Sequence, residues 1–142
     1  MAKDFEFIEH TADLKFISYG NTLDDCLKNS AKAVFAATLD LDSIFPATKK
    51  KISIRAESLE SLVHDFLSEL IFLFSARKMV FGKFDVNTKK ENGDYILNAF
   101  AYGEKLNLKK HKIEKEVKAV TYHDMKIEKT DSGWSIQVVC DV

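Results

Sequence analysis

The segment from Ser58 to Phe74 constrains the fold more than any other part of the chain. Its apolar residues follow the period of an α-helix without interruption, at Leu59, Leu62, Val63, Phe66, Leu67, Leu70, Ile71 and Phe74. Ser58, just before them, is a favourable N-cap. A helix with so broad an apolar face must be covered by other elements. We therefore expect it at the centre of the hydrophobic core.

The remaining periodicity predicts a second helix and about seven strands. Apolar residues recur at helical spacing from Leu23 to Leu39, behind the N-cap Thr22. Elsewhere the period is two, which predicts strands over residues 5–8, 14–19, 48–56, 80–90, 95–103, 117–129 and 134–142. Asn92-Gly93 is typical of a type I′ hairpin turn. We expect an α+β fold in a single domain spanning residues 1–142: a mostly antiparallel sheet of about six to seven strands with two helices packed on one face.

The composition excludes several classes of function. The 21 basic and 22 acidic residues give a net charge of −1, so no general field attracts nucleic acid. The longest apolar run, Leu70 to Phe74, is far too short to span a membrane, and the N-terminus lacks the features of a signal peptide. Cys26 and Cys140 are distant in sequence and fall on apolar faces, which predicts inert packing thiols in a reducing compartment. We expect a cytoplasmic protein without a membrane partner.

A polar turn near the N-terminus is the first candidate site. Glu9-His10-Thr11-Ala12-Asp13 interrupts two apolar, strand-like stretches, and nothing in core packing requires it. At the other end of the chain, Asp141 precedes Val142, which adds a carbonyl and an α-carboxylate. Hard divalent cations such as calcium and magnesium prefer oxygen ligands of this kind. The sequence alone does not bring Asp13 and Asp141 together, and two separate surface carboxylates are the alternative.

The last predicted hairpin places further polar residues near Asp141. Pairing around its short loop is expected to set Asp141 across from Tyr122 or Asp124, on the same face as Lys118. His123 is expected on the opposite face with apolar neighbours, where a histidine usually packs with one ring nitrogen bonded.

Two basic runs and one acidic pair have simpler interpretations. Lys49 to Lys51 begin a strand, where lysines usually discourage edge-to-edge aggregation. Lys109 to Lys112 lie in an irregular segment without an interleaved aromatic residue to stack bases. We therefore expect no strong stand-alone binding to nucleic acid. Asp65 and Glu69, one helical turn apart, are either solvated or used by a cation.

Four segments in order resemble the archease family, and the likeness covers nearly the whole chain. They are EHTADLKFISYGNTLDDCLKNSAKAVFA, LVHDFLSELIFLF, EVKAVTYHD and the terminal WSIQVVCDV. Phe66 stands where a tryptophan is expected in many members, a volume change in the core that should leave the site unaffected.

The resemblance implies a protein cofactor rather than an enzyme. Archeases assist the RtcB-type tRNA-splicing RNA ligase, promoting its guanylylation by GTP and multiple turnover on tRNA. The metal that the resemblance implies is calcium, with magnesium or manganese as alternatives, and its ligands map onto Asp13, Asp141 and Val142. Lys118 matches the family's functional surface. His10 and His123 match motif positions without an assigned role, and Glu9 belongs to the same motif as His10.

Two other functions remain open from the residues. A stand-alone metal-dependent hydrolase would use Asp13 and Asp141 with His10 as base. An RNA-binding module would use Lys49 to Lys51 and Lys109 to Lys112.

Overall fold

The computed structural model describes residues 3–9 and 13–142. Its seven strands form two antiparallel sheets. The first sheet has the order β1 (Phe5–Ile8), β2 (Leu14–Gly20), β7 (Gly133–Asp141) and β6 (Ala119–Thr130). The second has the order β3 (Thr48–Ala56), β5 (Asp94–Lys105) and β4 (Met79–Glu91). The helices are α1 (Leu23–Thr38), α2 (Leu59–Arg77) and the short 3₁₀ helix η1 (Leu41–Ser43).

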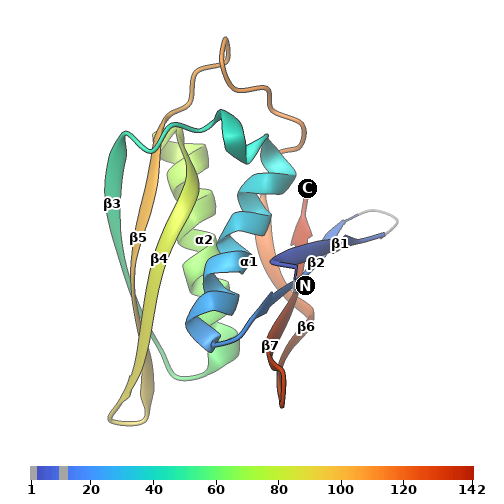
Figure 1. Cartoon of the computed structure of the whole chain (residues 1–142), viewed down its shortest axis with the longest axis vertical. Helices are drawn as coiled ribbons and strands as arrows, with labels where there is room; N and C mark the ends of the chain where they lie inside the picture. Colours follow the sequence, from blue (N-terminus) through green and yellow to red (C-terminus); the bar gives the residue numbers. More distant parts are fainter. Residues whose placement is uncertain (1–2, 10–12) are drawn as a thin grey trace.

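Both long helices lie between the two sheets (Figure 1). Helix α1 contacts β2 and β7 on one side and β4 on the other, and α2 contacts β6 and β3. The predicted α+β class, with two long helices and seven strands, is confirmed. The strands, however, form two sheets where one was expected. The broad apolar faces of the helices explain this arrangement, because a single sheet would cover only one side of them.

The local sequence signals work as expected. The Thr22 hydroxyl accepts a hydrogen bond from the Asp25 N–H at 3.1 Å, and the Ser58 hydroxyl accepts one from the Ser61 N–H at 3.1 Å. Both helices therefore begin at their predicted N-caps. Asn92 and Gly93 have φ angles of 52° and 84°, as a type I′ turn requires.

An aromatic cluster joins α1 to the second sheet. The Phe35 ring lies 5.7 Å from the Phe81 ring and 6.1 Å from the Phe84 ring, between centroids. All three side chains are almost fully buried. Such edge-to-face and stacked pairs add to the stabilisation from burial alone.

None of the helices in the described residues is long and apolar enough to cross a membrane.

Candidate functional site

The strand register brings Asp13 and Asp141 to the same end of the first sheet. Leu14, the first residue of β2, pairs with Cys140 of β7. Asp13 directly precedes Leu14 and Asp141 directly follows Cys140, so the two aspartates occupy neighbouring positions on adjacent chain segments. The end of β7 lies beside the start of β2 (Figure 1). Asp13 and the end of β7 therefore meet, which the sequence alone left open.

Lys118 reaches the same place through its backbone. Its N–H donates a hydrogen bond of 2.8 Å to the Asp141 carbonyl, and Ala119 pairs with Asp141. The expected pairing of Asp141 with Tyr122 or Asp124 is therefore wrong. The expectation that Lys118 and Asp141 share one face by strand alternation is also wrong, because Asp141 is opposite Ala119, the residue after Lys118. Lys118 is adjacent to Asp141 through this backbone hydrogen bond.

A bulge in β6 causes the difference. Thr121 pairs with Val139 and Lys126 pairs with Gln137, so residues 122–125 lie opposite Val138 alone. Asp124 within the bulge has a φ angle of 53°, a left-handed conformation that aspartate tolerates better than most residues. The extra residues shift the register and break the strict alternation on which the prediction depended.

The bulge also changes the surroundings of His123. Its side chain is 69% exposed, and its Nε2 lies 3.4 Å from an Asp124 carboxylate oxygen. The expectation that His123 packs among apolar neighbours is wrong, because the residue lies in the bulge and outside the regular pairing. In the same bulge, the Tyr122 ring stacks on the His64 ring of α2, with centroids 4.4 Å apart and planes at 6°.

His64 also contacts one member of the acidic pair Asp65 and Glu69 on α2. A carboxylate oxygen of Asp65 lies 3.1 Å from Nδ1 of His64. Asp65 thus has a side-chain partner within its own helix. No sequence pattern indicated the stacking of His64 on Tyr122, since it depends on the bulge.

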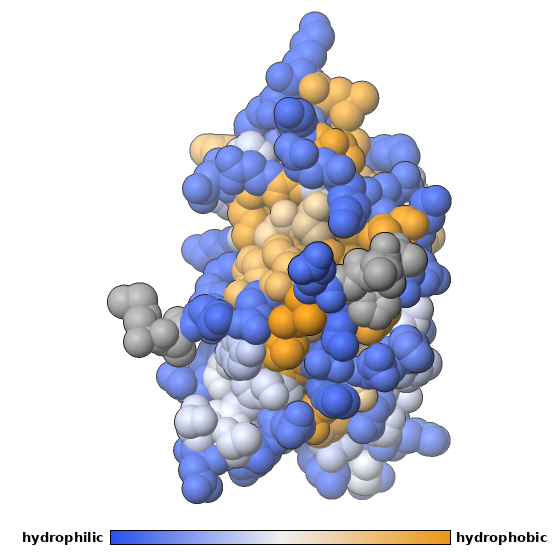
Figure 2. Space-filling model, turned by 90° about the vertical axis from the view of Figure 1, so that its right-hand side faces the viewer, coloured by the Kyte–Doolittle hydropathy of each residue, from blue (hydrophilic) through white to orange (hydrophobic). Residues whose placement is uncertain are grey.

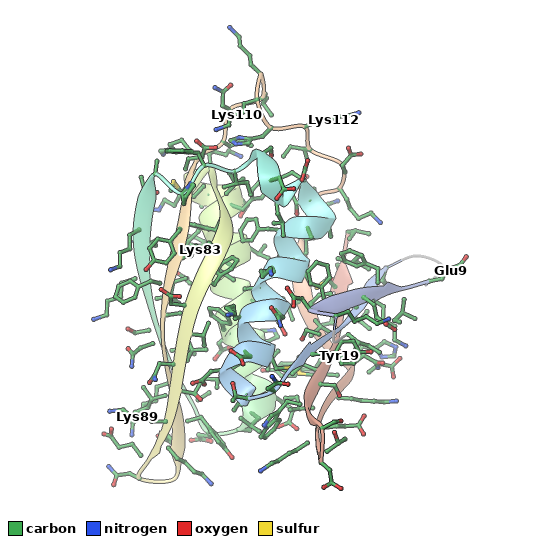
Figure 3. All side chains as sticks on the ribbon, in the orientation of Figure 1. Glu9, Tyr19, Lys83, Lys89, Lys110 and Lys112 are labelled. Atoms are coloured by element: carbon green, nitrogen blue, oxygen red, sulfur yellow. The ribbon has the colours of Figure 1, made fainter. Side chains whose placement is uncertain are left out.

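Glu9 lies at the outer end of β1 and points away from the helices (Figure 3). It is exposed. His10 belongs to the predicted site but lies outside the described residues.

An open apolar depression of about 530 Å³ adjoins Asp13. Phe7, Ile8, Leu14, Ala36 and Ala37 supply its apolar lining, and the charged residues at it are Glu9, Asp13, Lys15 and Lys115. Phe7 is 45% exposed. Figure 2 shows an apolar area bordered by charged side chains on this side of the molecule. Exposed apolar surface rimmed by charge is typical of a contact surface for another protein.

The donor chemistry at this end of the sheet suits a hard cation. Asp13 and Asp141 supply carboxylate oxygens, and Val142 adds further oxygen atoms next to Asp141. Within residues 3–9 and 13–142, no three His, Cys, Asp or Glu side chains gather as a metal-binding group. A site here would therefore depend on two aspartates and main-chain oxygens.

A hydrogen-bonded anchor holds the segment that leads to Lys118. One carboxylate oxygen of Glu104 accepts hydrogen bonds from the Phe45 N–H at 2.9 Å, Lys110 Nζ at 2.6 Å and His111 Nε2 at 2.8 Å. Nδ1 of the buried His111 accepts a bond from the Asn107 N–H at 2.9 Å, which assigns the neutral ring with its proton on Nε2. Lys110 and His111 thus fix residues 106–118, at the top of Figure 3.

This anchor predicts a pH dependence of stability. Hydrogen bonds from Lys110 and from the Phe45 N–H lower the pKa of Glu104 from 4.5 to about 2. Because the folded state depresses this pKa, its stabilisation is complete above about pH 4.5 and is lost as the pH falls toward 2. We expect Glu104→Gln to lower the free energy of unfolding at pH 6 and to flatten its fall below pH 4.5. Urea unfolding across this range measures both effects, with Glu128→Gln on an exposed strand position as the control.

The two cysteines are packing residues. Both are free and fully buried, and burial raises the pKa of Cys26 to about 11 and of Cys140 to about 12. Neither thiol is therefore accessible or ionised as a nucleophile would require, which confirms the expectation from their apolar spacing.

Comparisons with known proteins define the class of protein. The archease protein family (MTH1598/TM1083) matches residues 5–142. "Protein archease" of Methanosarcina mazei is 42% identical over 99% of this chain and 97% of its own length. "Protein archease" of Pyrococcus furiosus is 41% identical over 99% of both chains.

A solved structure agrees with the fold. The solution structure of Methanobacterium thermoautotrophicum protein 1598 superposes with a TM-score of 0.87 and 33% identity, covering 98% of this chain and 99% of that one. The chain belongs to the archease family, which is not named for an enzymatic activity.

Proposed function

We propose that this protein is a non-catalytic activator of an RtcB-type tRNA-splicing RNA ligase, promoting guanylylation of the ligase by GTP and multiple turnover. Family membership and the motif resemblance give the direction of this proposal. The observation that supports it is the strand register, in which Asp13 and Asp141 occupy neighbouring positions, together with the backbone hydrogen bond from Lys118 to Asp141. Two carboxylates and a lysine at one sheet end would form a small polar site, and the neighbouring Cys140 thiol is buried with a raised pKa rather than activated.

Asp13, Asp141 and Val142 are the residues that would hold a divalent cation. Calcium suits an all-oxygen donor set, and magnesium or manganese are the alternatives. The bound ion would neutralise charge on phosphate groups. Lys118 would add a cationic group beside the carboxylates and bind a phosphate of a nucleotide held by the ligase. GTP and tRNA would thus meet the protein through the ligase.

The apolar depression supports a protein partner. It adjoins Asp13 and includes the exposed Phe7, so a protein docked there would lie next to the proposed metal site. Two free cysteines suit the reducing cytoplasm, where we place this activity.

A turnover assay tests the proposal. The ligase of the same organism, in limiting amount, is given GTP, divalent metal and broken tRNA, with and without this protein. We expect about one ligation per ligase without it and many with it. No increase in turnover or guanylylation would contradict the proposal, and sustained phosphoester hydrolysis by the isolated protein would favour a hydrolase.

A further inference from the structure

The outer face of the second sheet carries aromatic residues between rows of lysines. The register aligns Tyr102 of β5 with Lys49 of β3 and Lys83 of β4. One row away, Phe100 of β5 aligns with Lys51 of β3. Directly opposed residues of an antiparallel sheet project from the same face, so these five side chains share one surface.

That surface is open. Figure 1 shows both long helices on the other side of β3, β5 and β4. On the opposite face of the sheet, Ile52 of β3 and Ala99 of β5 are buried beneath them. The lysines of the outer rows are exposed and the two aromatic rings are half-buried. In the described part of the chain, the helices that contact this sheet are α1, α2 and η1, and no strand of the first sheet contacts it.

The lysines lie against the rings rather than against carboxylates. Lys49 Nζ is 4.1 Å from the centroid of the Phe100 ring, and Lys83 Nζ is 5.7 Å from that of Tyr102. Within residues 3–9 and 13–142, no carboxylate forms a salt bridge with Lys49, Lys51 or Lys83. These ammonium groups are therefore available to an external anion.

The rest of the face is also basic. Arg55 and Lys89 extend it along β3 and β4, the latter labelled in Figure 3. The acidic residues of this face have partners: Asp85 accepts a hydrogen bond from the Tyr102 hydroxyl at 2.9 Å, and Asp94 accepts one from Arg55 at 2.9 Å. Glu91 pairs with Lys89 at 3.2 Å. The face thus has an excess of positive charge although the whole chain has a net charge of −1.

We infer that this face binds single-stranded nucleic acid, with bases stacking on Phe100 and Tyr102 and phosphates contacting the flanking lysines. Flat aromatic rings on a sheet, bordered by cations, are the combination that single strands require. A duplex hides its bases and would gain only the phosphate contacts. Because the rings accept any base, the site would be tolerant of sequence and modest in affinity.

The sequence pattern did not indicate that aromatic residues lie beside Lys49 to Lys51. Lys49 to Lys51 have no aromatic neighbour in the sequence, and Phe100 and Tyr102 lie about fifty positions later. The pairing of β3 with β5 brings the two sets together. Lys109 and Lys112 of the second basic run have no such pairing, since they lie in the irregular segment between β5 and β6.

Fluorescence anisotropy with labelled twelve-nucleotide oligo(U), oligo(dT) and an RNA duplex tests the inference. At low salt we expect oligo(U) to bind in roughly the 10–100 µM range, as non-specific sites do. Phe100→Leu and Tyr102→Leu keep apolar cover but remove the stacking surface, so each should weaken binding at least about fivefold. Lys51→Gln should reduce the slope of log affinity against log salt by about 0.7.

Matched variants separate this face from other surfaces. Tyr95→Leu removes another aromatic residue of β5, whose ring also lies under a lysine, Lys90. By strand alternation, Tyr95 projects from the opposite face of the sheet to Phe100 and Tyr102. The Tyr95→Leu variant should bind oligo(U) like the wild type, as should the double variant Lys109→Gln with Lys112→Gln. Thermal unfolding of each variant checks that it is folded at the assay temperature.

Three results would overturn the inference: no binding of oligo(U) at about 1 mM protein, equal binding of duplex and single strand, or equal losses for Tyr95→Leu and Phe100→Leu. Preference for oligo(U) over oligo(dT) identifies RNA as the ligand, and equal affinity identifies single strands of either kind. The inference is independent of ligase activation, because Asp13 lies at the end of the other sheet, directly before β2. Asp13→Ala should leave oligo(U) binding unchanged even if it abolishes activation.

Discussion

Asp141→Ala is expected to reduce stimulation of the ligase to the level seen without this protein. This substitution removes a carboxylate from the end of β7, where Asp141 neighbours Asp13 and its carbonyl accepts the hydrogen bond from the Lys118 N–H. Asp13→Ala should have the same effect, because either change leaves a single side-chain carboxylate for a divalent cation. Ligase turnovers and a calorimetric titration with calcium measure the activity and the metal affinity separately. We expect both to be lost together in the aspartate variants.

Two further variants sharpen this prediction. Lys118→Gln should lower stimulation while keeping metal affinity, since its ammonium group is proposed to bind phosphate and not the metal. Asp131→Ala, at the opposite end of the same hairpin, is the matched control and should behave like the wild type. Normal stimulation by Asp13→Ala or Asp141→Ala would refute the metal site while leaving activation by another surface possible.

Phe35→Ala is expected to cost about 3–5 kcal/mol in the free energy of unfolding. The side chain is 1% exposed and its ring contacts Phe81 and Phe84, so the substitution leaves a cavity between α1 and β4. Domains of this size are stable by only about 5–15 kcal/mol. The change should therefore lower the melting temperature by roughly 10 °C or more. Urea and thermal unfolding followed by circular dichroism measure it.

Phe72→Ala is the matched control for this loss. Phe72 is also on a helix, but it is 47% exposed and its ring lies 6.0 Å from the Arg77 guanidinium. Its truncation should cost less than about 1 kcal/mol, because little buried surface is removed. Similar losses in both variants would show that α1 and β4 are not held together by the aromatic cluster.

The elements of the fold were predictable because they depend on local signals. The N-caps Thr22 and Ser58 and the Asn92-Gly93 turn act over a few residues, and the structure uses each as expected. The division into two sheets was not predictable from these signals. Period-two alternation shows that a strand has a buried face, but it does not identify which strands share a sheet.

The candidate site was predictable in part, for the same physical reason. The residue types of Asp13 and Asp141 indicated oxygen ligands from the sequence alone. That the two residues lie close together follows only from the pairing of Leu14 with Cys140 in the structure. The position of Asp141 relative to Lys118 failed because strict alternation was extended through residues 122–125, where β6 has its bulge. A bulge depends on how two strands pair and not on the local sequence of one of them. The alternation of Val120, Tyr122 and Asp124 therefore contains no sign of it.

The place of β7 in its sheet has a consequence for how the protein is made. This strand is synthesised after the other six strands of the described residues, yet it lies between β2 and β6, whereas β3, β4 and β5 are complete by residue 105. During translation the second sheet and both long helices have left the ribosome while β2 and β6 still lack their shared neighbour. The unpaired edges of these strands are prone to pairing with other chains. The nascent protein is therefore vulnerable to aggregation until β7 has left the ribosome, and Asp13 and Asp141 can meet only after that point.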